Sequence, residues 1–408
     1  MNNSPASRSL SILIYVLPAI ADMVVAQFFF INAVRLARMG ASASVVANTI
    51  TTWGIVYLLT CPVLGRFGTP KNAAPMMMVG LGGMTLISML FTVIPGIAGI
   101  YVLTGLVAIG AALFFVPFQI YMKAIDAGNQ KTVSYSTGLY TFSWSLGFAC
   151  GPFVSGFLME QGTTAHPGWM FACWFATGAS ALACALVFVL KRLADATPRR
   201  GHPGPETPPP GALDYSQRPD LAWLGWIAGG IGVLALSFVR GVFPARAEAV
   251  LHLSQSMQGL IFFLLSLAQA LTGLILCRSR TWMYERSGML AFGLAGILGS
   301  LTLGFARSPL LLGAAAVLFG IYAGGFFFYL VFHALIHPAL SSRYVAVNES
   351  VVGIATLFGA LIGGGVADLF GFGSLYSLGA MLILTFIIFQ TSVTAKQKKN
   401  SLPLQSII

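Results

Sequence analysis

The segment from Gly138 to Gly156 reads GLYTFSWSLGFACGPFVSG, and it combines an uncharged, mostly apolar stretch with residues that weaken helices. In water glycine and proline oppose a helix, whereas in a bilayer small residues let two helices approach closely and pack. Pro152 adds a kink where it stands. The segment therefore predicts a membrane-crossing helix in tight contact with its neighbours. Its glycines are Gly138, Gly147, Gly151 and Gly156.

The whole chain has the composition of an integral membrane protein. Of its 408 residues 57% are hydrophobic and 8% are charged, and the mean hydropathy is +0.84. A soluble domain could not bury that much apolar surface. Because one crossing takes roughly 20 apolar residues, the sequence predicts an all-α membrane protein with twelve transmembrane helices. We expect these helices at about 10–33, 44–64, 74–94, 97–121, 134–159, 168–190, 221–243, 257–277, 287–305, 309–333, 346–369 and 372–393.

A hydrophilic segment at 191–220 divides the twelve helices into six and six. It contains seven prolines, which is typical of a solvated linker. We therefore expect two six-helix bundles, in residues 1–190 and 221–395, and a tail at 396–408.

The basic residues predict the orientation of the chain. The 22 Lys and Arg residues divide 17 to 5 between the two sides of the predicted membrane. By the positive-inside rule, the linker and both termini lie in the cytoplasm and the protein lies in the cytoplasmic (inner) membrane. The net charge of +11 is thus a signal of topology, and binding of nucleic acid is not expected.

The two halves of the chain resemble each other. A shift of 212 residues aligns Gly147 with Gly359 and Gly151 with Gly363 without a gap, and it also aligns Arg66 with Arg278. Such a repeat predicts two bundles related by a pseudo-two-fold axis along the membrane normal, with a substrate site between them near the midplane.

Over essentially its full length the sequence resembles the major facilitator superfamily. The family has a loop G-x-x-x-D-R-x-G after its second helix, and the matching stretch here is CPVLGRFGTPK, with Cys61 and Gly65 in place of the first Gly and the Asp. The partner loop in the second half, CRSRTWMYER, also lacks the acid. The resemblance implies a role in gating at the cytoplasmic side, and simple positive-inside charge is the alternative. The residues that match are Arg66, Gly68, Lys71 and Arg278.

The segment quoted at the start is similar to a second family motif. Drug and metabolite antiporters of the superfamily carry G-x(8)-G-x(3)-G-P-x-x-G-G in their fifth helix, and only Ser155 departs from that pattern here. The resemblance implies that this helix takes part in gating and that the protein is closest to the proton-coupled exporters. Ordinary glycine packing is the alternative.

Asp22 is the strongest candidate for a functional side chain. It is the only acidic residue deep within a predicted span, where an ionised carboxylate costs a few kcal/mol and usually faces a polar cavity. A site that holds either a proton or the substrate would make Asp22 the residue of proton coupling. Tyr15 and Phe29 share its helical face and extend the cavity. An Asp that merely bonds neighbouring helices is the alternative.

Two other predicted helices contribute candidate cavity residues. The resemblance implies that the tenth helix lines the cavity, and four of its side chains recur on one face, although aromatic stripes also arise from packing. The fourth helix offers Gln119 and Tyr121, but it lacks the arginine common in proton-coupled exporters. The stripe consists of Tyr322, Phe326, Tyr329 and His333.

Arg240 has two interpretations, and Glu349 has one with two alternative partners. Arg240, a candidate cavity residue, either extends to the outer headgroups or holds an anionic group near the exit. Glu349, at the start of the eleventh helix, is expected to pair with Arg66 or Lys131 when the cytoplasmic side closes. Because Asp22 and Leu234 stand where anion transporters of the superfamily carry deep arginines, we expect a neutral or cationic substrate.

These patterns predict a monomeric secondary transporter that exports a small organic solute in exchange for protons. Its expected partners are the solute, protons and the bilayer, without a cofactor or metal. Uptake or facilitated diffusion of a metabolite, or a transporter-like sensor without flux, are the alternatives. An enzyme is not expected, because the sequence has no nucleophile elbow, no paired intramembrane aspartates and no complete metal set.

Overall fold

The computed structural model describes residues 5–94, 96–126, 133–196, 220–276, 286–335 and 341–400, some helix ends by their backbone alone. All regular structure in these ranges is helical, and twelve of the helices are long and apolar enough to cross a membrane. The prediction of an all-α protein with twelve spans is confirmed.

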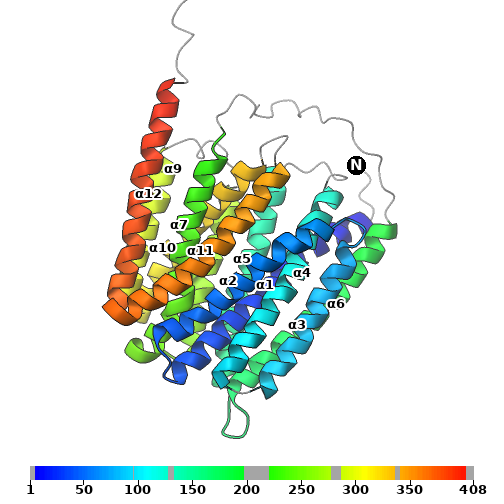
Figure 1. Ribbon diagram of the computed structural model, residues 1–408, viewed down its shortest axis with the longest axis horizontal. Coiled ribbons are helices and arrows are strands. Elements are labelled where there is room, and N and C mark those ends of the chain that lie inside the picture. The colour runs from blue at the N-terminus through cyan, green and yellow to red at the C-terminus, as the bar shows by residue number, and fades with distance from the viewer. Residues whose placement is uncertain are drawn as a thin grey trace, which may run out of the picture.

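The first six helices belong to one half of the molecule (Figure 1). Their bounds are α1 (Pro5–Arg38), α2 (Ala43–Phe67), α3 (Ala73–Val93), α4 (Gly96–Asp126), α5 (Val133–Glu160) and α6 (Gly168–Ala196). The second half begins with α7 (Ala222–Arg246), which continues into a π-helical turn, η2 (Ala247–Leu251). It goes on with α8 (Gln255–Leu276), α9 (Arg286–Phe305), α10 (Pro309–Leu335), α11 (Ser341–Phe370) and α12 (Phe372–Asn400).

The halves meet along a seam that runs through the centre of the molecule. Helices α1 to α6 pack mainly on one another and α7 to α12 do the same, while α5 on α8 and α2 on α11 form the main contacts between halves. Helix α7 also contacts α1 and α2 across the seam. The start of α7 and the end of α6 lie at the same end of the bundle, at the top of Figure 1. We call this the linker end and the opposite one the far end.

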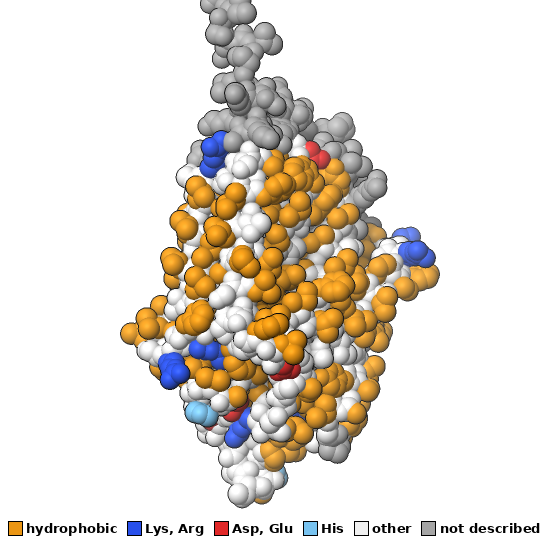
Figure 2. All heavy atoms as spheres, turned by 60° about the vertical axis from the view of Figure 1, so that its left-hand side comes forward, with side chains coloured by type: hydrophobic (Ala, Val, Ile, Leu, Met, Phe, Trp, Pro, Cys, Tyr) orange, Lys and Arg blue, Asp and Glu red, His pale blue; other side chains and the backbone are white. Residues whose placement is uncertain are grey.

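The outside of the bundle is apolar. Figure 2 shows hydrophobic side chains over most of one face, with charged side chains only scattered among them. Leu59, Ile275 and Leu310 are examples of large side chains that stay exposed. Apolar surface of this extent on a folded chain indicates contact with lipid, as the twelve spans require.

Glycines bring α5 against its neighbours on both sides of the seam. A Cβ atom at Gly151 would lie 2.5 Å from the carbonyl oxygen of Met23, and one at Gly147 would collide with the carbonyl of Ala19, both in α1. Toward α8, a Cβ at Gly156 would meet the carbonyl of Gln255. The backbones therefore pack with almost nothing between them, which is the close approach that the sequence predicted.

The second half repeats this arrangement. A Cβ at Gly359 in α11 would lie 2.7 Å from the carbonyl oxygen of Leu234 in α7, and one at Gly363 would lie 3.0 Å from the Phe238 ring. Because Gly359 and Gly363 align with Gly147 and Gly151, each half joins its first and fifth helices through equivalent glycines. The gating role of the α5 glycines, of Gly138 and of Pro152 stays a prediction.

Replacing Gly147 by alanine should lower the stability of the fold. The new methyl group meets backbone atoms that cannot rotate away, and overpacking of this kind costs about 1–3 kcal/mol. Gly178→Ala is the matched control, since nothing lies within 4 Å of a Cβ at that helical position. We expect a lower thermal midpoint for purified Gly147→Ala in detergent and an unchanged or slightly higher one for Gly178→Ala. Equal midpoints would contradict the close contact of α5 with α1.

Candidate functional site

Three ionisable side chains lie together where the two halves meet. Asp22 comes from α1, and it interacts electrostatically with Arg240 of α7 and with Glu349 of α11. Asp22 is only 7% exposed, and the α1 residues around it, such as Ala21 and Val25, are buried as well. The carboxyl group therefore faces protein and not lipid, and its charged neighbours belong to the other half. We call these three residues the charge column.

Helix α1 holds Asp22 in place because it is the central helix of its half. It packs against α2, α4, α5 and α6, and it contacts α7 across the seam. Its polar residues point inward as well: the Asn32 amide donates to the Thr104 hydroxyl at 3.0 Å, and Gln27 is fully buried. A charged group this far from solvent is stable only with compensating partners.

Glu349 reaches from the second half into the first. It accepts a hydrogen bond of 3.3 Å from the Gln119 side chain of α4. It also acts electrostatically on Tyr57 of α2 and Tyr140 of α5. The expected partner Arg66 is exposed, and Lys131 lies outside the described residues. Glu349 thus accepts a hydrogen bond from Gln119, a predicted cavity residue, and its pairing with Arg66 or Lys131 in a form closed at the linker end stays a prediction.

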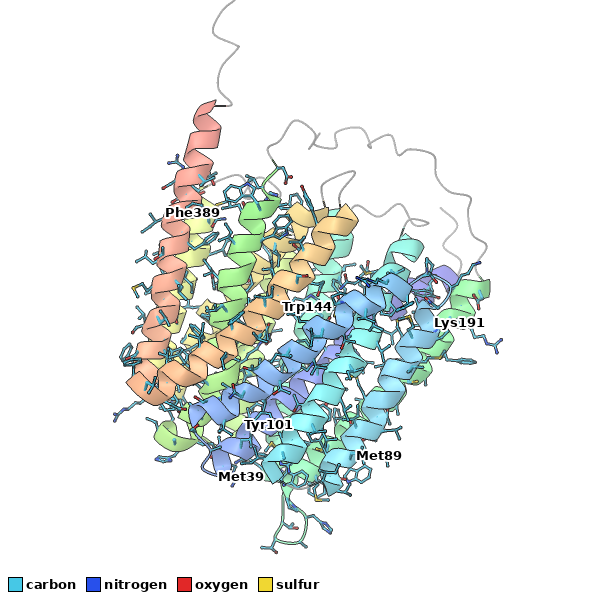
Figure 3. All side chains as sticks on the ribbon, in the orientation of Figure 1. Met39, Met89, Tyr101, Trp144, Lys191 and Phe389 are labelled. Atoms are coloured by element: carbon cyan, nitrogen blue, oxygen red, sulfur yellow. The ribbon has the colours of Figure 1, made fainter. Side chains whose placement is uncertain are left out.

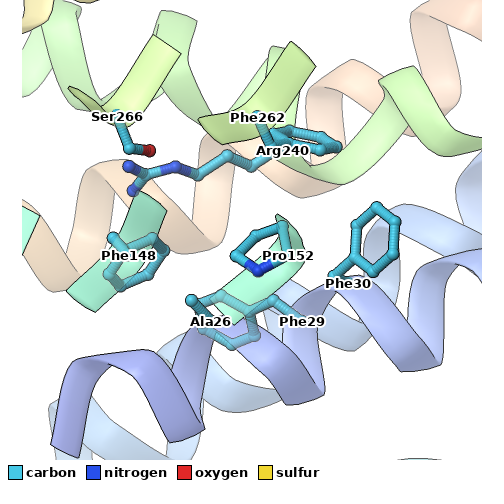
Figure 4. A pocket seen from close by; sticks show the side chains of 8 residues that line it. All are labelled: Ala26, Phe29, Phe30, Phe148, Pro152, Arg240, Phe262 and Ser266. Atoms are coloured by element: carbon cyan, nitrogen blue, oxygen red, sulfur yellow. The ribbon is translucent and has the colours of Figure 1, made fainter. Parts of the chain in front are cut away.

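Arg240 points into the seam rather than toward headgroups. Its guanidinium lies over the Phe148 ring of α5, with 4.1 Å from Cζ to the ring centroid. Figure 4 shows it between Phe148 and Ser266. The Nη2 atom is buried and has no hydrogen-bond partner among the described residues. The interpretation in which Arg240 extends to the outer headgroups is wrong, because the cation–π contact holds the side chain inside the protein.

A small cavity lies beside Arg240, between α1 and α5 of one half and α7 and α8 of the other. It offers about 20 Å³ of space to the centre of a water molecule, which is room for about one water. This cavity is therefore too small for an organic solute in this structure. The lining residues are Ala26, Phe29, Phe30, Phe148, Pro152, Arg240, Phe262 and Ser266.

A larger hollow, of about 460 Å³, lies at the far end among residues of α9, α11 and α12. Its lining includes Phe305, Leu378 and Met381, with serines as its only polar side chains. The charge column lies elsewhere, at the seam. We therefore place the candidate site at the seam and not in the larger hollow.

The sequence profile of the Major Facilitator Superfamily matches residues 9–328. The chain belongs to the Major Facilitator Superfamily. It is therefore a membrane transporter of the secondary kind and not an enzyme. Among curated proteins, no sequence matches this chain.

Two solved transporters share the fold of this superfamily member. One is the human organic anion transporter MFSD10 (TETRAN), with a TM-score of 0.63 and 14% identity, over 95% of this chain and 99% of that chain. The other is the nucleoside transporter NupG, with a TM-score of 0.68 and 11% identity, over 95% of this chain and 99% of that chain. At these identities the likeness concerns the fold alone.

The aromatic stripe of α10 packs inside the second half of this superfamily member instead of lining the seam. The Tyr322 ring lies against Gly296 of α9, and the Phe326 ring against Gly232 of α7. Tyr329 belongs to a buried cluster with residues of α7, α9 and α12, and His333 is buried edge-on to it, 4.4 Å between ring centroids. In this structure glycines of α7 and α9 draw that face inward, and a role of these four residues in the cavity stays a prediction.

The neighbouring position of α10 crosses the seam. Phe327 meets Trp144 of α5 edge-on, with 5.1 Å between ring centroids, and Trp144 lies between the halves in Figure 3. A buried hydrogen bond of 2.8 Å from the Gln269 amide to the Ser145 hydroxyl also joins α8 to α5. These contacts were not predicted from the sequence, because the periodicity of aromatic residues along α10 does not show which side of the helix contacts the first half of the molecule.

Of the other predicted cavity residues, Phe29 alone lines the small cavity. Tyr121 is buried in the core, and the Tyr15 carbonyl accepts a hydrogen bond from the Ser143 hydroxyl. Gln27 is a polar residue that sequence analysis missed. Both polar atoms of its amide are buried without a hydrogen-bond partner among the described residues. A polar residue inside an apolar span was the signal for it, as it was for Asp22.

The loop motif lies at the linker end. Arg66 and Lys71 are exposed, and Gly68 ends α2, where its N–H donates to the Leu64 carbonyl at 2.8 Å. Arg278 lies outside the described residues. The gating role of this motif stays a prediction.

Two carboxylates join the halves at the far end, and they do so in equivalent ways. The backbone N–H groups of Ala43 and Ser44 at the start of α2 donate to Asp368 of α11 at 2.8 and 3.0 Å. Ser256 at the start of α8 donates to Glu160 of α5 through its N–H at 2.9 Å and its hydroxyl at 2.7 Å. Each carboxylate thus caps a helix N-terminus of the opposite half, an arrangement that favours a closed far end.

Removing both caps should open the far end. A carboxylate at an exposed helix N-terminus stabilises the capped arrangement by about 0.3–1 kcal/mol. The double variant Glu160→Gln, Asp368→Asn should therefore shift the population toward a form with an open far end. Pulsed EPR between spin labels at Met39 and Arg307, which are exposed and lie in different halves, would report a longer distance. Met39 is labelled at the far end in Figure 3.

The control for this experiment is Asp195→Asn, which removes an exposed carboxylate at the linker end of α6. It should leave the distance unchanged. An unchanged distance in the double variant as well would show that the caps do not hold the far end closed.

Proposed function

We propose that this transporter moves a small organic solute across the membrane by alternating access and couples that movement to protons through Asp22. The observation that carries the proposal is the position of Asp22, a buried carboxyl group of one half with a cation and a second carboxyl group of the other half beside it. Because these two neighbours belong to the other half, the electrostatic energy of the Asp22 carboxyl group depends on how the two halves are placed.

The charge column supplies a physical link between protonation and movement. An ionised Asp22 attracts Arg240 across the seam, whereas a protonated Asp22 does not, so the proton changes the free energy of the closed form. The Glu349 carboxyl group, bonded to Gln119, adds a second interaction whose strength depends on its charge. A solute that binds at the seam acts on the same equilibrium, which is the requirement for coupling.

For direction and placement we propose export from a cytoplasm at the linker end. The basic residues at that end support the placement in an inner membrane, and the similarity of α5 to exporter helices supports the direction. The solved neighbours include an organic anion transporter and a nucleoside transporter, so the range of solutes stays wide.

Proton-linked uptake is the second candidate, and a specific observation favours it. An ionised Asp22 would balance the charge of Arg240 when the site is empty. A solute anion on Arg240 together with a proton on Asp22 would keep the same net charge, which favours solute and proton moving in the same direction. The absence of an arginine in α4 between Ile97 and Met122 agrees with this alternative.

Proteoliposomes with a pH-sensitive dye inside would test the coupling. Nucleosides, organic anions and organic cations are added one class at a time, and the active solute should move protons across the membrane. In Asp22→Asn the proton movement should stop while exchange of labelled for unlabelled solute continues, because only the titratable group is lost.

The direction of the proton movement distinguishes the two candidates: in exchange protons move opposite to the solute, and in proton-linked uptake they move with it. Asp195→Asn serves as control and should behave like the unaltered protein. Full proton-driven transport by Asp22→Asn would disprove the role of Asp22 in coupling.

A further inference from the structure

Arg240 has unused capacity to bind an anion. An arginine side chain stays charged at neutral pH and offers five N–H donors in one plane. Stacking on Phe148 covers one face of that plane, so a ligand would bind at its edge. Nη2 is buried without a hydrogen-bond partner among the described residues. A buried donor in this state costs free energy that a ligand acceptor would recover.

The second arginine near this end of α7 differs from Arg240 in its contacts, although its Nη1 atom is also buried without a hydrogen-bond partner among the described residues. Arg246 lies six positions further on and is 3% exposed. Its Nη2 atom donates to the Ala306 carbonyl at 2.8 Å, which ties α7 to the end of α9. Arg246 thus has a structural role within its own half, whereas Arg240 contacts a ring of the other half and borders a cavity.

The rest of the cavity is suited to an apolar body. Four phenyl rings line it, together with Ala26 and Pro152, and Ser266 supplies its only hydroxyl group. No acidic side chain is among these lining residues. One cation at the edge of an aromatic wall selects a ligand with one anionic group and a flat apolar part. The rings are Phe29, Phe30, Phe148 and Phe262.

The position of the cavity explains how a solute would enter a space that now holds about one water. Its walls come from α1 and α5 on one side and from α7 and α8 on the other. When the halves separate, these walls move apart and the cavity enlarges, with Arg240 on one wall and Phe148 on the other. Closing of the seam then encloses the solute between them.

We propose that Arg240 binds the anionic group of the transported solute, and that this solute is an aromatic carboxylate or an organic anion of the same shape. The proposal rests on the proposed function, since it names the substrate class of the same site. A carboxylate accepts two parallel N–H bonds from a guanidinium edge, which gives geometric selectivity as well as attraction. The anion then takes the place of Asp22 as the counter-charge of Arg240, an arrangement that favours proton-linked uptake, the second candidate above, over export in exchange for protons. This assignment replaces the neutral or cationic substrate expected from the sequence.

Binding of benzoate, benzamide and benzylammonium to the purified protein in lipid nanodiscs tests the proposal. The three probes share one ring and differ in charge. We expect benzoate to raise the thermal unfolding midpoint and to bind about tenfold or more tightly than the other two, as loss of a charge-assisted hydrogen bond implies. Equal binding of all three, preference for benzylammonium, or no binding of benzoate would overturn the assignment.

Variants locate the binding site. Arg240→Gln should lose the benzoate preference, and Arg240→Lys should keep part of it, since charge remains but the paired N–H edge does not. Arg35→Gln is the matched control: Arg35 also stacks on an aromatic ring, Trp169 at 3.8 Å, and also has a buried nitrogen without a partner among the described residues. It does not line the cavity, and its loss should leave benzoate binding unchanged. If Arg35→Gln removes binding and Arg240→Gln does not, the site is elsewhere.

The binding experiment and the flux assay can overturn the anion site and the proposed function independently of each other. Benzoate binding that depends on Arg240, without proton-driven transport of any solute, would support the anion site and overturn the proposed function. Proton-driven transport of a cation or a neutral solute, without benzoate binding, would support the proposed function and overturn the anion site. Phe148→Leu gives a second measure if Arg240→Gln does not fold, because loss of the stacked ring should weaken benzoate binding and leave the charge in place.

Discussion

Burial of opposite charges at the seam is the constraint on which the structure depends. Asp22 and Arg240 come from different halves, and each would be costly to bury alone. An ionised Asp22 attracts Arg240 only while the halves are close together, so this attraction favours the closed form. The pair therefore connects the charge of one side chain to the arrangement of two six-helix bundles.

The rest of the fold keeps this pair in place and lets it separate. Glycines bring α5 against α1, and α11 against α7, so that the first and fifth helices of each half pack closely together. The far end is held by exposed carboxylates that cap helix termini, whereas the centre is held by buried charges and rings. Exposed caps are weak enough to break, and buried contacts are specific enough to form again.

Much of this architecture follows from the sequence. The lengths of the hydrophobic segments predicted the twelve helices, and the glycines of α5 predicted close packing. Asp22 was evident as a candidate because an acidic side chain within a membrane span is energetically costly. The direction of a long side chain was not predictable: Arg240 could reach headgroups or the seam, and only the Phe148 ring decides between them. Likewise, the α10 stripe is periodic whichever way it faces, and glycines of α7 and α9 turn it inward.

A double-mutant cycle on Asp22 and Arg240 tests the central claim most directly. Thermal unfolding of Asp22→Asn, Arg240→Gln and the double variant would be measured in the same nanodiscs. The account predicts that the double variant is more stable than the two single effects added together, by about 0.5–3 kcal/mol, because neither charge is left alone. Single effects that simply add, to within about 0.5 kcal/mol, would contradict the pairing of the two charges across the seam.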